Sequence, residues 1–291
     1  MDINYELYRV FYYVATSLSF SEASKKLFIS QSAVSQSIKV LEKKLDRRLF
    51  TRSTKKVQLT PEGEILLKHV EPAMNLLQRG EMQLMEADSL NGGQLRIGAS
   101  DTICHYYLLP FLKKFHQEYP NVHIRVSNQT SICCGKMLED GQADLIIVNY
   151  PNPVLHNRNT IKIVKEFQDV FLAGEKYQKL RGREVALAEI AKYPILMLDR
   201  QSTTSEFLHI IFQKYQLDLV PEIEISSNAL LIDLARIGLG VTFIPDYCVP
   251  QTEEVFAIRL KEELPYRKLV AVYNEKLPLS QAAEYFLDML Q

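Results

Sequence analysis

The sequence lacks the short motifs that would point to an enzyme. It contains no Gly-rich phosphate loop, no GxSxG nucleophile motif and no HExxH metal motif. None of its six histidines has the spacing of metal ligands: His69, His105, His116, His123, His156 and His209. We therefore predict that the protein is not an enzyme and that it uses no metal and no cofactor.

Long apolar runs and paired cysteines are also missing. No apolar stretch approaches the roughly 18 residues that a membrane-spanning helix needs. The first residues, MDINYELYRV, lack the basic and apolar regions of a signal peptide. The four cysteines form neither a CxxC pair nor a zinc-binding pattern: Cys104, Cys133, Cys134 and Cys248. These absences predict a protein of the reducing cytoplasm that does not associate with membranes.

The charges of the chain are unevenly distributed although the net charge is only −1. Residues 1–60 hold 11 Lys and Arg against 5 Asp and Glu, whereas the remaining residues hold 23 against 30. A basic N-terminal segment suits a phosphate backbone, and an acidic remainder does not. The two parts of the chain are therefore expected to face different partners.

Apolar spacing and capping residues predict three helices near the N-terminus. The first has one apolar face at i, i+3, i+4 and i+7, made by Leu7, Val10, Phe11 and Val14. Ser19 or Ser21 caps a short second helix, whose inner side carries Ala23 and Leu27. Ser30 caps the third helix, with an inner stripe of Val34, Ile38, Leu41 and Leu45. Two short helices joined by a tight turn at residues 28–29 form a helix-turn-helix.

Small or amide-bearing side chains lie on the outer side of the predicted third helix. Gln pairs with adenine through two hydrogen bonds, and Ser donates or accepts at several base edges or at phosphate. Basic residues follow directly, on an extension that ends in a predicted wing strand at residues 57–59. The predicted DNA-binding residues are Ser30, Gln31, Ser32, Ser35, Gln36, Lys39, Arg52 and Lys55.

The chain resembles the LysR-type transcriptional regulators. The resemblance depends on FSEASKKLFISQSAVSQSIKVLEKKL, followed by RLFTR and LTPEG, and it extends over the whole chain. It implies that Gln31, Ser32, Ser35 and Gln36 read or position DNA and that Arg52 holds phosphate. Asp46 departs from the glycine usual in the family, but aspartate tolerates the left-handed conformation, so we expect the turn to form.

A long connecting helix is predicted after Thr60-Pro61, which form a good helix start. Its apolar residues alternate by three and four, with Glu81 as an interruption: Leu67, Val70, Met74, Leu77 and Leu84. Such a seam is typical of a helix that pairs with a second helix. The alternative is a helix packed on its own domain. Pro72 is expected to kink it.

From residue 94 onward, predicted strands and helices alternate, which is typical of parallel sheets covered by helices. Strands are expected at 95–99, 123–127, 145–148, 195–198, 222–225, 241–244 and 269–273. Helices are expected at 107–119, 132–139, 205–215, 230–237 and 281–290. The pattern resembles a two-lobed clamp of the periplasmic-binding-protein type, with crossovers near residues 160 and 265.

Ligands of such sheets bind beyond the carboxyl ends of the strands. Loops rich in hydroxyls and amides follow those ends, and several of them lead into helix N-termini, which favour an anion or a carboxylate. Asp101 departs from this pattern because it repels a dianion or binds an amine, so the charge of the effector stays open. The predicted effector-binding residues are Ser100, Thr102, Gln129, Thr130, Ser131, Asn149, Ser202, Thr203 and Asn228.

Two rival interpretations remain. The adjacent Cys133 and Cys134 suggest a thiol-based redox sensor, although we expect both to be buried structural thiols, with Cys104 near the cleft edge. The other rival is a solute-binding protein whose N-terminal segment only dimerises, but that class needs an export signal.

The predicted architecture joins an all-α winged helix-turn-helix at 1–60 and a linker helix at 61–90 to an α/β effector-binding domain at 94–291. Lobe I covers about 94–160 and 266–291, and lobe II about 161–265. We expect a bacterial regulator that binds double-stranded DNA at an interrupted dyad under control of a small-molecule effector. Homodimers through the linker helix are expected to pair into homotetramers, and RNA polymerase is a candidate partner.

Overall fold

The computed structural model describes residues 3–52, 57–86, 93–155, 159–275 and 277–290. The chain divides into two compact units, the first formed mainly by residues 1–87 and the second mainly by residues 88–291. Within the described residues, no helix combines the length and the apolar character that crossing a membrane requires.

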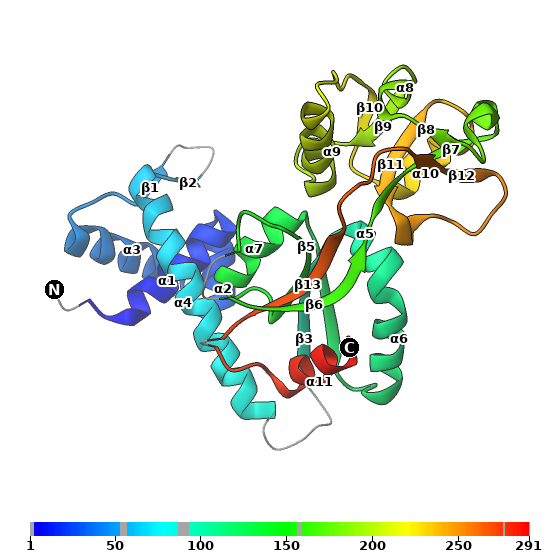
Figure 1. Cartoon of the computed structure of the whole chain (residues 1–291). Helices are drawn as coiled ribbons and strands as arrows, with labels where there is room; N and C mark the ends of the chain where they lie inside the picture. Colours follow the sequence, from blue (N-terminus) through cyan, green and yellow to red (C-terminus); the bar gives the residue numbers. More distant parts are fainter. Residues whose placement is uncertain (1–2, 53–56, 87–92, 156–158, 276, 291) are drawn as a thin grey trace. The chain divides into compact units, whose positions relative to one another are not determined.

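The first unit begins with three helices and a small hairpin (Figure 1). The elements are α1 (Tyr5–Ser17), α2 (Phe20–Leu27), α3 (Gln31–Leu45), β1 (Phe50–Arg52) and β2 (Val57–Leu59), with β1 and β2 antiparallel. The inner faces of the helices bury Phe11, Val14, Val34, Ile38 and Leu41 completely. This confirms the predicted helix-turn-helix and its wing.

The helix ends follow from individual residues. Ser19, not Ser21, caps α2, and its hydroxyl accepts a hydrogen bond from the Glu22 N–H at 3.2 Å. Asp46 takes the left-handed conformation with φ of 51°, and its N–H donates to the last carbonyls of α3. The prediction that the turn forms with aspartate in place of glycine is therefore confirmed.

The LTPEG segment joins the hairpin to α4 (Pro61–Glu86). The Thr60 hydroxyl donates to the Arg48 carbonyl at 2.7 Å and accepts from the Gly63 N–H at 3.0 Å. A Cβ atom on Gly63 would lie 2.2 Å from the Leu49 carbonyl oxygen, so only glycine allows this close approach. The segment fixes where α4 starts against the winged domain.

The apolar seam of α4 is divided in its environment. Val70 is buried, and Leu66, Leu67 and Met74 pack in the same core as α1. Leu77 and Leu84, further along, are 64% and 77% exposed. The first half of the seam thus packs on its own domain, while the second half presents apolar side chains to solvent. The helix is continuous through Pro72.

Lobe I of the second unit is a five-stranded sheet with helices on both faces. Its elements are β3 (Gln94–Ala99), α5 (Asp101–Ile103), the π-helix η1 (Cys104–Leu108), α6 (Leu109–Glu118), β4 (His123–Asn128), α7 (Ser131–Glu139), β5 (Leu145–Tyr150), β6 (Asn159–Phe167), β13 (Arg267–Asn274) and α11 (Gln281–Met289). The strand order is β4-β3-β5-β13-β6, with β13 antiparallel to both its neighbours. The helix expected at 107–119 begins six residues earlier, at Asp101, because the Ser100 hydroxyl caps it.

Lobe II is a six-stranded sheet in the order β10-β9-β11-β7-β12-β8. Its elements are β7 (Asp169–Gly174), η2 (Glu175–Leu180), β8 (Glu184–Val185), α8 (Leu187–Ile190), β9 (Ile195–Leu198), α9 (Thr203–Lys214), β10 (Pro221–Ile225), α10 (Asn228–Arg236), β11 (Val241–Pro245), η3 (Asp246–Cys248) and β12 (Val255–Leu260). The strands β10, β9 and β11 run parallel, while β7 is antiparallel to β11 and β12. Both sheets are therefore mixed, and the prediction of parallel sheets was wrong.

Two neighbouring segments connect the lobes, β6 into β7 and β12 into β13 (Figure 1). Because β6 belongs to the sheet of lobe I, the chain first crosses at Gln168 rather than near residue 160. The chain returns to the sheet of lobe I at the start of β13, Arg267.

Candidate functional site

The exposed side of α3 carries most of the side chains predicted to contact DNA. Ser35 is half-buried, and the other predicted residues of this helix and its cap are exposed: Ser30, Gln31, Ser32, Gln36 and Lys39. On the opposite side of the helix, Val34, Ile38 and Leu41 are fully buried in the core of the winged domain. Amides, hydroxyls and one ammonium group therefore project together from a single helix, which a major groove admits.

Two hydroxyls at the start of α3 share a hydrogen bond. The oxygens of Ser30 and Ser32 lie 2.8 Å apart, and the Ser30 hydroxyl also accepts from the Ala33 N–H at 3.2 Å. Whichever hydroxyl donates to the other, one O–H remains for an outside acceptor. Together with the free N–H groups of the first turn, this end of α3 suits a phosphate oxygen.

Of the two basic residues predicted on the wing, the structure describes only Arg52. Arg52 ends β1, where its backbone pairs with Val57 of β2. Lys55 lies in residues 53–56, outside the described residues. Their contact with phosphate stays a prediction.

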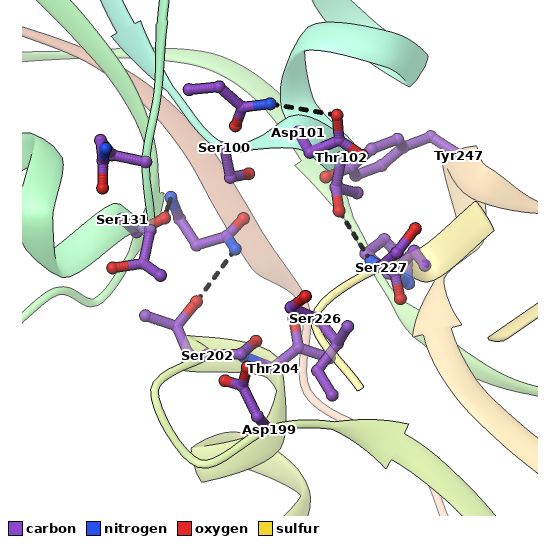
Figure 2. A pocket seen from close by; sticks show the side chains of 18 residues that line it. Ser100, Asp101, Thr102, Ser131, Asp199, Ser202, Thr204, Ser226, Ser227 and Tyr247 are labelled. Carbon is purple, nitrogen blue, oxygen red and sulfur yellow. Dashed lines mark hydrogen bonds between the residues drawn. The ribbon is translucent and has the colours of Figure 1, made fainter. Parts of the chain in front are cut away.

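The second unit contains a cavity of about 410 Å³. It lies at the carboxyl ends of β3, β4, β5, β9, β10 and β11, where both lobes contribute side chains (Figure 2). All nine predicted effector residues line it. The full lining comprises Ser100, Asp101, Thr102, Asn128, Gln129, Thr130, Ser131, Asn149, Leu198, Asp199, Ser202, Thr203, Thr204, Ser226, Ser227, Asn228, Pro245 and Tyr247.

Four hydroxyls of the lining cap helices that begin at the cavity. Each accepts a hydrogen bond from a backbone N–H of the first turn and keeps its own hydrogen for another acceptor. The distances are 3.4 Å from Ser100 to Ile103, 3.3 Å from Thr130 to Cys133, 3.2 Å from Ser202 to Thr204, and 3.4 Å from Ser227 to Leu230. Capping and ligand binding are therefore compatible roles for the same hydroxyl groups.

Two hydrogen bonds join the lobes across the cavity. The Asn149 amide of lobe I donates to the Thr203 hydroxyl of lobe II at 3.0 Å. In the other direction, the Asn228 amide of lobe II donates to the Thr102 hydroxyl of lobe I at 2.9 Å. Figure 2 draws both bonds. The walls of the cavity are thus held together by the same residues that line it.

A buried ion pair supports the floor of the cavity. Arg267 Nη1 lies 2.8 Å from Asp169 Oδ2, and its guanidinium also donates to the hydroxyls of Thr203 and Thr204 at 3.3 and 3.2 Å. The guanidinium lies between the rings of Phe167 and Phe207. Burial raises the pKa of Asp169, and the attraction of Arg267 opposes that rise. Asp169 and Arg267 lie on the two segments that connect the lobes, and the hydrogen bonds of the guanidinium orient the start of α9.

Burial disfavours the thiolate form of three of the four cysteines, Cys104, Cys134 and Cys248. All four are free, and Cys133 is exposed, which corrects the expectation that it is buried. Burial raises the pKa of Cys104 to about 11 and that of Cys134 to about 12, so both thiols stay protonated near neutral pH. Cys104 is not among the residues that line the cavity.

Several lining residues were not predicted. Pro245 ends β11 and Tyr247 lies two residues beyond it. The carboxyl end of this strand obeys the same rule as those of the other parallel strands, but its loop carries few hydroxyls. Asn128 and Asp199 are the last residue of β4 and the first after β9. Among the residues described, no group of three or more His, Cys, Asp or Glu side chains could hold a metal ion.

Comparison with known proteins places both units. Residues 5–64 match the family model described as bacterial regulatory helix-turn-helix protein, lysR family, and residues 88–291 match the LysR substrate binding domain. A "Probable RuBisCO transcriptional regulator" from Synechocystis sp. is 26% identical over 286 residues, covering 96% of this chain and 83% of that protein.

Full-length solved structures share the fold. OxyR C199D from Pseudomonas aeruginosa matches with a TM-score of 0.75 at 18% identity, covering 100% of this chain and 95% of that one. CbnR complexed with its target DNA matches with a TM-score of 0.71 at 15% identity, covering 99% of each chain.

A winged helix-turn-helix joined to a two-lobed ligand-binding fold defines a DNA-binding transcriptional regulator with an effector-binding domain. The chain belongs to the LysR family. Family membership decides against the solute-binding alternative and confirms the predicted function.

Proposed function

We propose that α3 enters the major groove of an interrupted dyad and that a small-molecule effector in the cavity controls how the protein holds that DNA. The observation that carries the first part is the exposed polar face of α3 over a fully buried apolar face. The second part depends on the cavity of about 410 Å³, within the size range of small-molecule sites.

The effector acts by changing how the lobes are held together. The bonds from Asn149 to Thr203 and from Asn228 to Thr102 close the cavity between residues that the effector would also contact. An effector that replaces or bridges these bonds changes the angle between the lobes. We expect that change to alter the spacing of paired DNA-binding domains.

The proposed assembly is a homodimer through α4, and pairs of dimers form a homotetramer. The exposed half of the α4 seam supports the dimer, since Leu77 and Leu84 present apolar surface at heptad spacing. In the first unit, a groove between α1 and α4 adds the rings of Tyr5, Tyr8 and Tyr13 to this surface. A two-fold protein reads a two-fold site, and RNA polymerase bound beside it is a candidate partner.

The protein acts in the cytoplasm as a regulator and not as an enzyme. The support is the family assignment together with a lining of hydroxyls and amides, a composition suited to holding a ligand.

Replacement of Gln36 tests the DNA-binding surface. Gln36→Ala removes one exposed amide from α3, and we expect specific affinity for the operator to fall about tenfold to hundredfold, because one base contact contributes about 1–3 kcal/mol. Affinity is measured by fluorescence anisotropy with an operator duplex and with a scrambled duplex at fixed salt.

The matched control is Gln213→Ala, which removes another exposed amide, from α9 in lobe II. It should leave both affinities unchanged. If Gln36→Ala binds the operator as tightly as the unmodified protein, α3 does not read bases through this residue and the proposed docking is wrong.

A further inference from the structure

The lining of the cavity carries negative charge on both walls. Asp101 belongs to lobe I and Asp199 to lobe II, while the described residues that line the cavity include no lysine, arginine or histidine. Arg267 touches two lining hydroxyls from behind, but its charge is neutralised by Asp169 at 2.8 Å. A phosphate or a dicarboxylate would find no cation here to balance its charge.

The same cavity also presents donors that suit a single carboxylate. The helices α7, α9 and α10, of 9, 12 and 9 residues, begin at its wall. Their capping hydroxyls, on Thr130, Ser202 and Ser227, accept from the helix and keep a hydrogen to donate. Helix N-termini favour one negative charge without a cationic side chain.

Two buried acceptors in the lining have no donor. The Oδ1 atoms of Asn149 and Asn228 have no hydrogen-bond partner in the described part of the chain, and these residues are only 8% and 2% exposed. Their Nδ2 groups are engaged in the bonds between the lobes. A buried acceptor without a donor is unfavourable, and an ammonium group supplies three donors.

From these features we infer that the effector is a small zwitterion of the amino-acid class, with one carboxylate and one protonated amine. The inference rests on the proposed role of the cavity as the effector site. The carboxylate lies at the capped helix starts. The ammonium group lies toward the carboxylates of Asp101 and Asp199 and the free oxygens of the two asparagines.

Other ligand classes match only part of the lining. A dianion gains from the helix starts but is repelled by two carboxylates on opposite walls. A neutral polyol satisfies hydroxyls and amides but brings no positive charge to the two carboxylates, which among the described residues accept hydrogen bonds only from neutral donors, the Asn128 amide and the Gln201 N–H. A zwitterion complements both the helix starts and the two carboxylates, and it adds no net charge.

The test is a binding screen with the full-length protein. Thermal shift and isothermal titration calorimetry are run with the common L-amino acids. A dicarboxylate, a sugar phosphate and a polyol are tested in the same way. For each amino acid that binds, the screen also includes two truncated analogues, the amine that lacks the carboxylate and the acid that lacks the amine. We expect at least one amino acid to bind and both truncated partners to bind about tenfold to hundredfold more weakly, as for loss of a charge-assisted hydrogen bond.

Two variants test whether the amine binds beside the carboxylates of Asp101 and Asp199. Asp101→Asn and Asp199→Asn should each weaken the amino acid about tenfold or more and leave the melting temperature of the free protein unchanged. The control Asp218→Asn, at an exposed position outside the lining, should have no effect.

The other outcomes overturn the inference in distinguishable ways. Tighter binding of a dicarboxylate, sugar phosphate or polyol, weakened by Thr203→Val, retains the cavity as the effector site but contradicts the amino-acid class. Binding of an amino acid that neither aspartate variant changes also contradicts it. If no compound of any class binds, the cavity is not the effector site and the proposed function fails as well.

Discussion

Arg267 is the residue on which the geometry of the cavity floor depends. Its guanidinium joins Asp169 to the hydroxyls of Thr203 and Thr204, and its side chain is only 4% exposed. Nothing in its local sequence, Leu264 to Lys268, distinguishes it from a surface arginine at a strand start. Only the approach of β7 and β13 reveals that it has a buried partner 98 residues away.

Removal of Arg267 should lower the free energy of unfolding, because the carboxylate of Asp169 stays buried. We expect Arg267→Met to destabilise the second unit by about 3–5 kcal/mol, because it leaves Asp169 buried without a partner. Arg259→Met is the control, since the Arg259 side chain is 78% exposed and its pair with Glu184 contributes little. The measurement is urea unfolding followed by circular dichroism.

The loss should depend on pH with a defined sign. Burial raises the pKa of Asp169 above its ordinary value, so ionising the carboxyl is harder in the folded state than in the unfolded state. A group of this kind favours folding below its unfolded pKa and loses that contribution as pH rises through its folded pKa. Arg267→Met should therefore be less destabilising at pH 5 than at pH 8. An equal loss at both pH values would show that the defect lies in packing rather than in charge.

Residues of the cavity could be predicted from the sequence where they also cap a helix. Ser202 and Ser227 precede predicted helices and follow predicted strands, so both rules indicate the same loops. Asp199 and Tyr247 also follow predicted strands, but neither stands at the cap of a predicted helix, so only one of the two rules indicates them. They line the cavity because lobe II turns its strand ends toward lobe I, which is a property of the chain crossing and not of any local pattern.

At the scale of elements, the two halves of α4 differ in burial, and a heptad pattern does not predict that difference. Its first half contributes Val70 to the core of the winged domain, and its second half leaves Leu77 and Leu84 exposed. The interpretation of a helix packed on its own domain therefore holds for the first half, and pairing through the second half stays a prediction.

Leu77→Glu should weaken self-association by about tenfold to hundredfold, because burial of one leucine contributes about 1.5–3 kcal/mol. Sedimentation velocity over a range of protein concentrations measures the change. Val220→Glu, at a position of lobe II that is 78% exposed, is the control. An unchanged association constant for Leu77→Glu would place the interface elsewhere.

The strands and helices with strong periodicity were predicted closely, and those without it were missed. The strand expected at 195–198 is observed at Ile195–Leu198, and the helix expected at 281–290 is observed as α11. The strands β6, β7 and β12 were not predicted. Two of them pair antiparallel with β13 or β11, and β12 pairs with β7, so their pattern reflects partners distant in sequence.

At the scale of the whole molecule, each unit contains one half of a regulatory switch. The first unit presents a polar helix face and an apolar linker seam, and the second encloses a polar cavity bridged by hydrogen bonds between its lobes. Linkage requires that a ligand which favours one lobe arrangement also changes DNA affinity whenever the two are coupled. The regulatory function thus depends on both units of the same chain.

Sequencing of genomic DNA fragments retained by the purified protein at near-physiological salt tests the central claim most directly. The account predicts a few strongly enriched fragments that share an interrupted dyad, and it predicts that Gln36→Ala loses this enrichment while Gln213→Ala keeps it. Uniform retention of all fragments, abolished by salt and unchanged by Gln36→Ala, would contradict sequence-specific reading by α3.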